Sequence, residues 1–222
     1  MKSIKFFFAP AAVGMMLVSC GEQTPADSAA ETATTETAKE GLSGEFSIDQ
    51  NNSVVNWEGN MVAIGGVSLY GHNGTIQFSE GSVTLENGKI TSGSVVVDMS
   101  TIRPLDDNYE DKDGRRAEDL VAHLSSDDFF NVEEHPNARL DITGMEDGKL
   151  MGDLTVRGNT NAVTIDKIKV KEGEDGTMMA SGEFTIDRQK YGAKFSMANA
   201  MDVRDKILSD DIKLAFEVKG AK

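Results

Sequence analysis

The sequence predicts an all-β domain, a barrel or a sandwich, built from short antiparallel strands. Apolar and polar residues alternate with a period of two in most segments after residue 45, as expected for strands with one buried face. Turn-forming pairs such as Asn87-Gly88, Asp147-Gly148 and Asp175-Gly176 separate these segments. Helical periodicity is limited to residues 115–124, with a weaker candidate at 200–208. Many short strands and few helices are typical of barrels and sandwiches.

The first twenty residues have the pattern of a bacterial lipoprotein signal. Lys2 and Lys5 precede an apolar stretch, residues 6–18, which is too short and too close to the N-terminus for an ordinary membrane span. The stretch ends in LVSC, which resembles a lipobox, and Cys20 is the only cysteine of the chain. We therefore expect residues 1–19 to be a signal peptide and Cys20 to be lipidated. The alternative is an ordinary signal peptide with a coincidental cysteine.

The segment that follows is expected to be a disordered tether. Residues 20–44 are dominated by Ala, Thr and Glu and contain almost no large apolar residues. Such a segment cannot bury enough surface to offset the entropy lost on ordering. The folded domain should therefore occupy residues 45–222.

The expected strands follow in order along the chain. In the first half they lie around residues 46–48, 55–57, 76–78, 83–85 and 94–99, and Val95, Val97 and Met99 share one face of the last of these. In the second half they lie around residues 140–142, 154–156, 163–170, 178–187 and 212–218. A bulge or irregularity is expected between Ile165 and Ile168, where the alternation breaks.

The charge of the chain excludes some classes of partner. The formal net charge is −15, and removal of Lys2 and Lys5 with the signal peptide would make it more negative. Nucleic acids bind through Lys and Arg, so we expect no nucleic-acid partner. Charge alone would not hold such a protein on anionic lipid either, so membrane attachment should depend on acyl chains at Cys20.

The segment HLSSDDFFNVEEHP, residues 123–136, raises three alternatives: an acid–base site, a metal site or an apolar plug flanked by solvated charge. The three histidines have no zinc-like spacing, and the domain contains no cysteine, so no metal is expected. The acidic run 106–114 fails as an EF-hand at both ends of the loop and is interpreted as a solvated loop. No nucleophile elbow or phosphate-binding loop is present, so no catalytic residue is assigned.

Phe129 and Phe130 are the feature of this segment that needs an apolar partner. Fully burying one phenylalanine is worth roughly 1.5–3 kcal/mol, so two in succession should dock against an apolar surface. Following a helix that ends at Leu124, they could form a lid over a barrel mouth, or they could simply complete a packed core.

At this point the sequence resembles the YceI-like, polyisoprenoid-binding family. The segments HLSSDDFFNVEEHPNARLDITG, GDLTVRGNTNAVTI, FTIDRQKYG and RDKILSDDIKLAFEV are similar to motifs of that family, occur in its order and extend the resemblance over residues 45–219. The opening strands differ from the common pattern and look more like lipid-anchored members from the Bacteroidetes lineage. His135 also stands where an aromatic residue is more usual, which bears on ligand size.

The resemblance implies an extended, lipocalin-like antiparallel barrel of eight strands, with one or two short helices near one end. It further implies an apolar channel for an isoprenoid or similar long-chain acyl lipid, with no other cofactor. An eight-stranded barrel can just hold one slim ligand.

The residues expected to line this channel lie on the inward strand faces, on the helix and on the aromatic pair. The inward faces carry no ionisable side chain. The full set is Trp57, Ile76, Phe78, Val95, Val97, Met99, Leu120, Leu124, Phe129, Phe130, Leu140, Ile142, Leu154, Val156, Phe184, Ile186, Leu214 and Phe216.

The function expected from these features is that of a non-enzymatic envelope lipoprotein that carries, stores or senses a lipid. It would be anchored through Cys20 on the periplasmic side or the cell surface, with the outer membrane favoured. One alternative is a solid-core barrel or sandwich that binds another envelope protein, and a more distant one is an enzyme on a similar barrel. The sequence does not fix the oligomeric state, and a dimer is compatible with it.

Overall fold

The computed structural model describes residues 41–63, 66–193 and 206–222. The expected signal peptide, Cys20 and residues 20–40 of the expected tether lie outside these ranges, as do residues 200–205 of the weaker helix candidate. No helix within the described ranges is long and apolar enough to cross a membrane.

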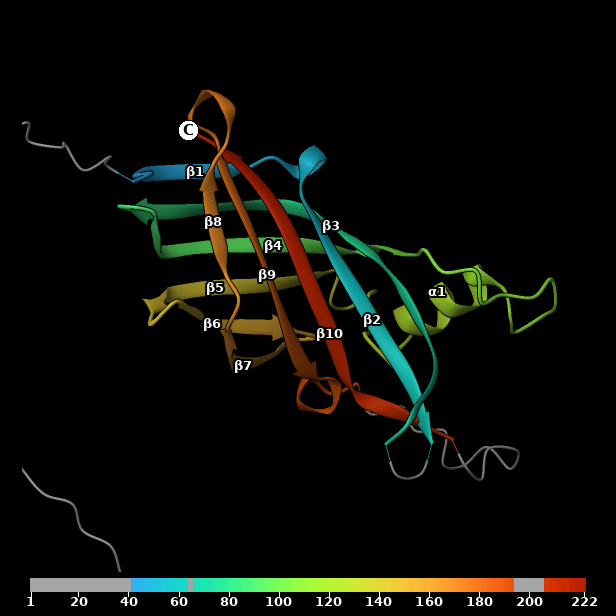
Figure 1. The fold of residues 1–222 in the computed structure, drawn as a ribbon. Helices are drawn as coiled ribbons and strands as arrows, with labels where there is room; N and C mark the ends of the chain where they lie inside the picture. The colour runs from blue at the N-terminus through green and yellow to red at the C-terminus, as the bar shows by residue number, and fades with distance from the viewer. Residues whose placement is uncertain (1–40, 64–65, 194–205) are drawn as a thin grey trace, which may run out of the picture. The chain divides into compact units, whose positions relative to one another are not determined.

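The described residues form one antiparallel sheet of ten strands (Figure 1). The strands are β1 Gly44–Ile48, β2 Val54–Ala63, β3 Ser68–Glu86, β4 Lys89–Pro104, β5 Asn137–Glu146, β6 Lys149–Val156, β7 Asn159–Ile165, β8 Lys169–Glu172, β9 Met178–Asp187 and β10 Lys206–Ala221. Three short 3-10 helices, η1 Gln50–Asn52, η2 Glu174–Gly176 and η3 Arg188–Tyr191, connect some of them. The helix α1 Ala117–Ser125 lies beyond the end of β4 (Figure 1).

The strand order is β7-β6-β5-β4-β3-β1-β10-β9-β8, and β2 also pairs with both β3 and β10. β1 and β2 therefore share one position between β3 and β10. The turn η1 separates them, because the Asp49 carboxylate accepts the backbone N–H groups of Asn51 and Asn52 and bends the chain there.

The mostly-β fold class with a short helix is confirmed, but the expected count of eight strands is wrong. The irregularity expected near Ile165 is a break between two strands: β7 ends at one edge of the sheet and β8 begins at the other edge. The two segments expected at 76–78 and 83–85 belong to one long strand, β3, whose pairing with β4 shifts register at several irregularities. The described end of the weaker helix candidate, residues 206–208, is extended and opens β10.

The turn chemistry explains why the sheet meanders. Asn87 and Gly88 both have positive φ, as do Asp147 and Gly148, and two such residues in succession match the tight hairpin turns that fit the twist of antiparallel strands. Each pair joins two sequence-adjacent strands that then hydrogen-bond to each other, β3 with β4 and β5 with β6.

Candidate binding cavity

The concave side of the sheet encloses an apolar cavity of about 340 Å³. All eighteen residues expected from the sequence to face a channel lie on its lining, drawn from the strands, α1 and the segment after it. Their role in binding a lipid stays a prediction.

The two ends of the cavity differ. At one end the side chains of Phe46, Leu85, Ile165 and Met178 are fully buried and close the interior. At the other end Tyr70 lines the cavity while remaining 45% exposed, so the cavity reaches the surface there. The cavity therefore has a closed end and a mouth, as a site that accepts one end of a chain requires.

Phe129 and Phe130 lie in the segment after α1, and both line the cavity. Phe129 is buried and meets Phe130 edge to face, with ring centroids 4.7 Å apart. Arg157 holds this segment by donating hydrogen bonds to the backbone carbonyls of Phe129 and Asp127, at 2.9 and 2.6 Å. Phe129 thus packs in the core and lines the cavity at once. The Asp127 and Asp128 side chains are exposed, in agreement with solvated charge.

Charged and polar groups also reach the lining, which the sequence-based expectation of an interior without ionisable side chains missed. His72, His123 and Arg188 contribute to it. The expectation failed because it considered only the strand segments expected from alternation. Arg188 lies in η3, His123 lies in α1, and His72 lies in the part of β3 before the segment expected at 76–78.

Arg188 is 3% exposed and its guanidinium is held by protein groups. Nε donates to the Ser209 carbonyl at 3.0 Å, Nη1 to the Ala193 carbonyl at 2.6 Å, and Nη2 to the Asp210 carboxylate at 2.9 Å. The guanidinium carbon also lies 5.8 Å from the Phe129 ring centroid. Burial lowers the pKa of Arg188, and nearby carboxylates act against that shift. Arg188 therefore links η3 to the start of β10 and to Phe129.

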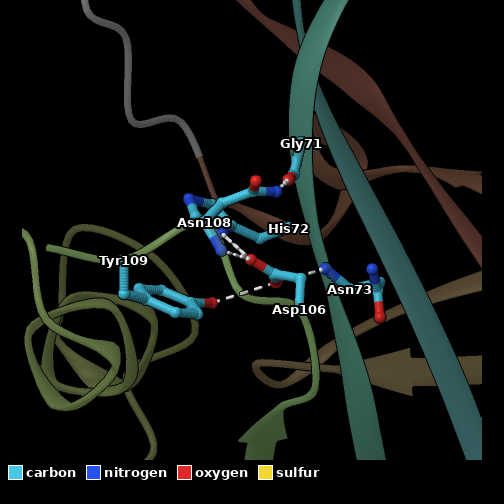
Figure 2. Close-up of polar contacts among 6 residues, drawn as sticks. All are labelled: Gly71, His72, Asn73, Asp106, Asn108 and Tyr109. Atoms are coloured by element: carbon cyan, nitrogen blue, oxygen red, sulfur yellow. Dashed lines mark hydrogen bonds and ion pairs between the residues drawn. The ribbon is translucent and has the colours of Figure 1, made fainter.

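A second polar group stands near the mouth, the His72–Asp106 cluster, formed by Gly71, His72, Asn73, Asp106, Asn108 and Tyr109 (Figure 2). The Asp106 carboxylate accepts the backbone N–H groups of Asn73 and Asn108, both at 3.0 Å, and the Tyr109 hydroxyl at 3.0 Å. His72 Nδ1 lies 3.1 Å from the same carboxylate, and the His72 and Tyr109 rings stack with centroids 5.2 Å apart.

The environment of Asp106 sets its charge. Its side chain is only 6% exposed, and burial alone would raise its pKa, but the hydrogen bonds it accepts outweigh burial and the pKa is lowered. Burial and the adjacent Asp106 carboxylate raise the pKa of Tyr109, which stays a donor. The interpretation of the acidic run as a solvated loop is therefore wrong for Asp106, which ties the loop after β4 to β3.

Trp57 on β2 forms part of the cavity wall. Its ring lies against Gly74 on β3, where a Cβ atom would be 2.6 Å from Cζ2 of the indole. The indole Nε1 is buried and has no hydrogen-bond partner among the described residues. Trp57 is thus held by packing, and it is the only tryptophan of the chain, which makes it a reporter for the cavity.

The described residues contain no group of three or more His, Cys, Asp or Glu side chains that could hold a metal ion. The carboxylates with resolved pKa shifts have lowered values, as for Asp106 and Asp141, so they are not tuned as general acids near neutral pH. The lining can enclose an apolar chain and present a few polar groups near the mouth.

An antiparallel, barrel-like sheet around an apolar cavity is the class of fold that these observations define. The YceI-like domain matches residues 46–220, and the chain therefore belongs to the YceI-like family.

Curated relatives and a solved structure agree with this assignment. A UPF0312 protein of Shewanella denitrificans is 30% identical over 154 residues, which covers 64% of this chain and 71% of the relative. One from Pseudomonas aeruginosa is 25% identical over 194 residues, covering 84% and 91%. The crystal structure of Burkholderia cenocepacia BcnA has the same fold, with a TM-score of 0.57 at 18% identity, covering 78% of this chain and 99% of that one.

Proposed function

We propose that this protein binds one long-chain apolar lipid, an isoprenoid or a similar acyl chain, in the cavity within its sheet. The observation that carries the proposal is an apolar cavity of about 340 Å³ that is closed at one end and open at the other. Resemblance to the polyisoprenoid-binding family favours an isoprenoid among such chains. A solid-core module that binds another envelope protein would not require this cavity.

The proposed binding mode places the hydrocarbon end of the lipid at the closed end and its polar end toward the mouth. The closed end offers only apolar side chains, so a charged or strongly polar group would lose its hydration there without gaining a partner. Near the mouth, His72 provides a polar atom on the lining. A mainly apolar lining suits binding without chemistry, so we propose a carrier, store or sensor and not an enzyme.

Extraction of the purified protein with organic solvent, followed by mass spectrometry, tests the binding proposal. We expect one prenyl or acyl lipid for each protein molecule, and native mass spectra should show the same stoichiometry. If native spectra contain apoprotein alone, and a long-chain isoprenoid quinone does not quench Trp57 fluorescence, the binding proposal fails.

We also propose that the protein is an envelope lipoprotein attached through acylated Cys20 by a flexible tether, as its N-terminal sequence suggests. A Cys20→Ser variant should lose metabolic labelling by an alkyne fatty acid. Proteolysis within residues 21–40 should release the folded domain from membranes. Unchanged labelling of the variant would contradict the anchor without bearing on the cavity.

A further inference from the structure

The hairpin formed by β2 and β3 differs in charge from the rest of the chain. Residues 59–79 contain no Asp, Glu, Lys or Arg, although these residue types make up 27% of the chain. The chain as a whole is acidic, with a net charge of −15. This hairpin is therefore the part of the domain that meets least repulsion from an anionic surface.

The same region carries most of the strongly exposed apolar side chains. Five large apolar residues of the described ranges are strongly exposed. Four of them lie together: Val67 immediately before β3, Leu69 and Tyr70 at the start of β3, and Leu105 immediately after β4. Leu105 donates its backbone N–H to the Asn73 carbonyl of β3 at 2.9 Å. We call these four residues the hairpin patch.

The hairpin patch continues directly into the cavity. Tyr70 belongs to both, and its partner across the strands, Met61, is buried and lines the cavity. The His72–Asp106 cluster fixes the base of this hairpin, because Asp106 binds Asn73 and Asn108 Nδ2 donates to the Gly71 carbonyl at 2.9 Å (Figure 2). The patch is therefore an ordered apolar surface at the mouth.

We propose that the hairpin patch docks the protein on a lipid bilayer, with the cavity mouth facing the membrane. The patch combines aliphatic side chains with a tyrosine, a residue type that favours the boundary between headgroups and hydrocarbon. A ligand could then pass between bilayer and cavity without exposure of its chain to water. The inference rests on the proposed function in one respect, that the cavity holds a membrane lipid.

The size of the patch favours a bilayer over a second protein. A stable protein interface buries about 800 Å² on each partner, which requires roughly 20–30 residues. Four side chains supply far less than that, whereas shallow insertion into a bilayer gains free energy from each apolar group separately.

The chain's lone cysteine allows a local test in the full-length protein. In a Cys20→Ser background, Val67→Cys or Met179→Cys provides a single attachment point for an environment-sensitive fluorophore. Met179 is the matched control, since it is also exposed and apolar but lies on β9, near the closed end where Met178 is buried. Vesicles of phosphatidylethanolamine and phosphatidylglycerol, with and without a nitroxide-labelled lipid, are then added.

We expect vesicles to shift the emission of the fluorophore at position 67 to the blue and the nitroxide lipid to quench it, while position 179 does not respond. A further Leu69→Glu substitution should raise the lipid concentration needed for half of this response by about tenfold or more. An unchanged signal at position 67, or a response that follows protein concentration without vesicles, as a second copy would cause, would overturn the proposal.

Native mass spectra of the same labelled protein separate this inference from the proposed function. Bound lipid without a vesicle response at position 67 would overturn docking and leave lipid binding intact. A vesicle response at position 67 without any bound lipid would support docking and count against lipid binding.

Discussion

Enlarging Val97 should shorten the lipid that the cavity accepts. Val97 lies on β4 and packs against both buried clusters of the core, the one around Phe129 and the one around Phe46. It therefore marks the boundary between the outer and inner parts of the cavity. Val97→Phe adds a ring at this boundary and should close off the inner part while the strands remain paired.

The expected magnitude follows from the cavity volume. An engineered cavity of about 150 Å³ holds benzene, so 340 Å³ corresponds to roughly thirteen or fourteen carbon atoms, between two and three isoprene units. The substitution adds four carbons to the side chain, which removes space for about four carbons of ligand. At about 0.8 kcal/mol for each methylene, a ligand that fills the cavity should lose about 3 kcal/mol, roughly a hundredfold in affinity.

Titration of Trp57 fluorescence with geraniol, farnesol and geranylgeraniol measures this effect. The native protein should bind farnesol much more tightly than geraniol, with little further gain for geranylgeraniol. Val97→Phe should bind geraniol nearly as well as the native protein does and should lose the advantage of farnesol. Val163→Phe is the matched control, because Val163 on β7 is partly buried and does not line the cavity. Equal farnesol affinity in all three proteins would refute the reasoning.

Three further predictions concern the mouth and the wall of the cavity. Phe130→Ala should lower lipid occupancy in native mass spectra, because Phe130 lines the cavity, whereas Asp128→Asn should not, and the opposite ranking would restore the acidic residues as the functional site. Asp106→Asn should cost about 2 kcal/mol in urea unfolding at neutral pH, since it weakens hydrogen bonds to a buried carboxylate. Because the folded-state pKa of Asp106 is lowered, that difference should be complete above about pH 4 and shrink as the pH falls through the folded pKa, and a difference independent of pH would contradict this account. Gly74→Ala should destabilise the domain by roughly 1–3 kcal/mol and change the emission of Trp57, since the new methyl group clashes with both the Arg103 carbonyl oxygen and the indole; destabilisation with an unchanged emission spectrum would show that the backbone of β4 yields and the ring does not.

Local patterns were sufficient to predict most strands and the inward faces. Side chains alternate between the two faces of a strand, so residues such as Leu154 and Val156 could be placed on the inside from spacing alone. The strand count failed where this local rule gives no information. The turn at Asp49 divides one sheet position between β1 and β2, and the break in alternation after Ile165 moves the chain from one sheet edge to the other. Local spacing does not distinguish such a break from a bulge within one strand.

The buried polar cluster near the mouth could not be predicted from local sequence patterns either, because its members are far apart along the chain. Asp106 lies in a run of acidic residues, and in sequence it cannot be distinguished from its exposed neighbour Asp107. Only the folded chain brings the donors of Asn73 and His72, more than thirty residues earlier, to one carboxylate. Burial of that carboxylate is tolerable because each of its oxygens accepts hydrogen bonds, and the bonds in turn fix the hairpin at the mouth. The cavity wall thus depends on strand alternation, which a sequence displays, whereas the orientation of its mouth depends on long-range contacts of a few polar side chains.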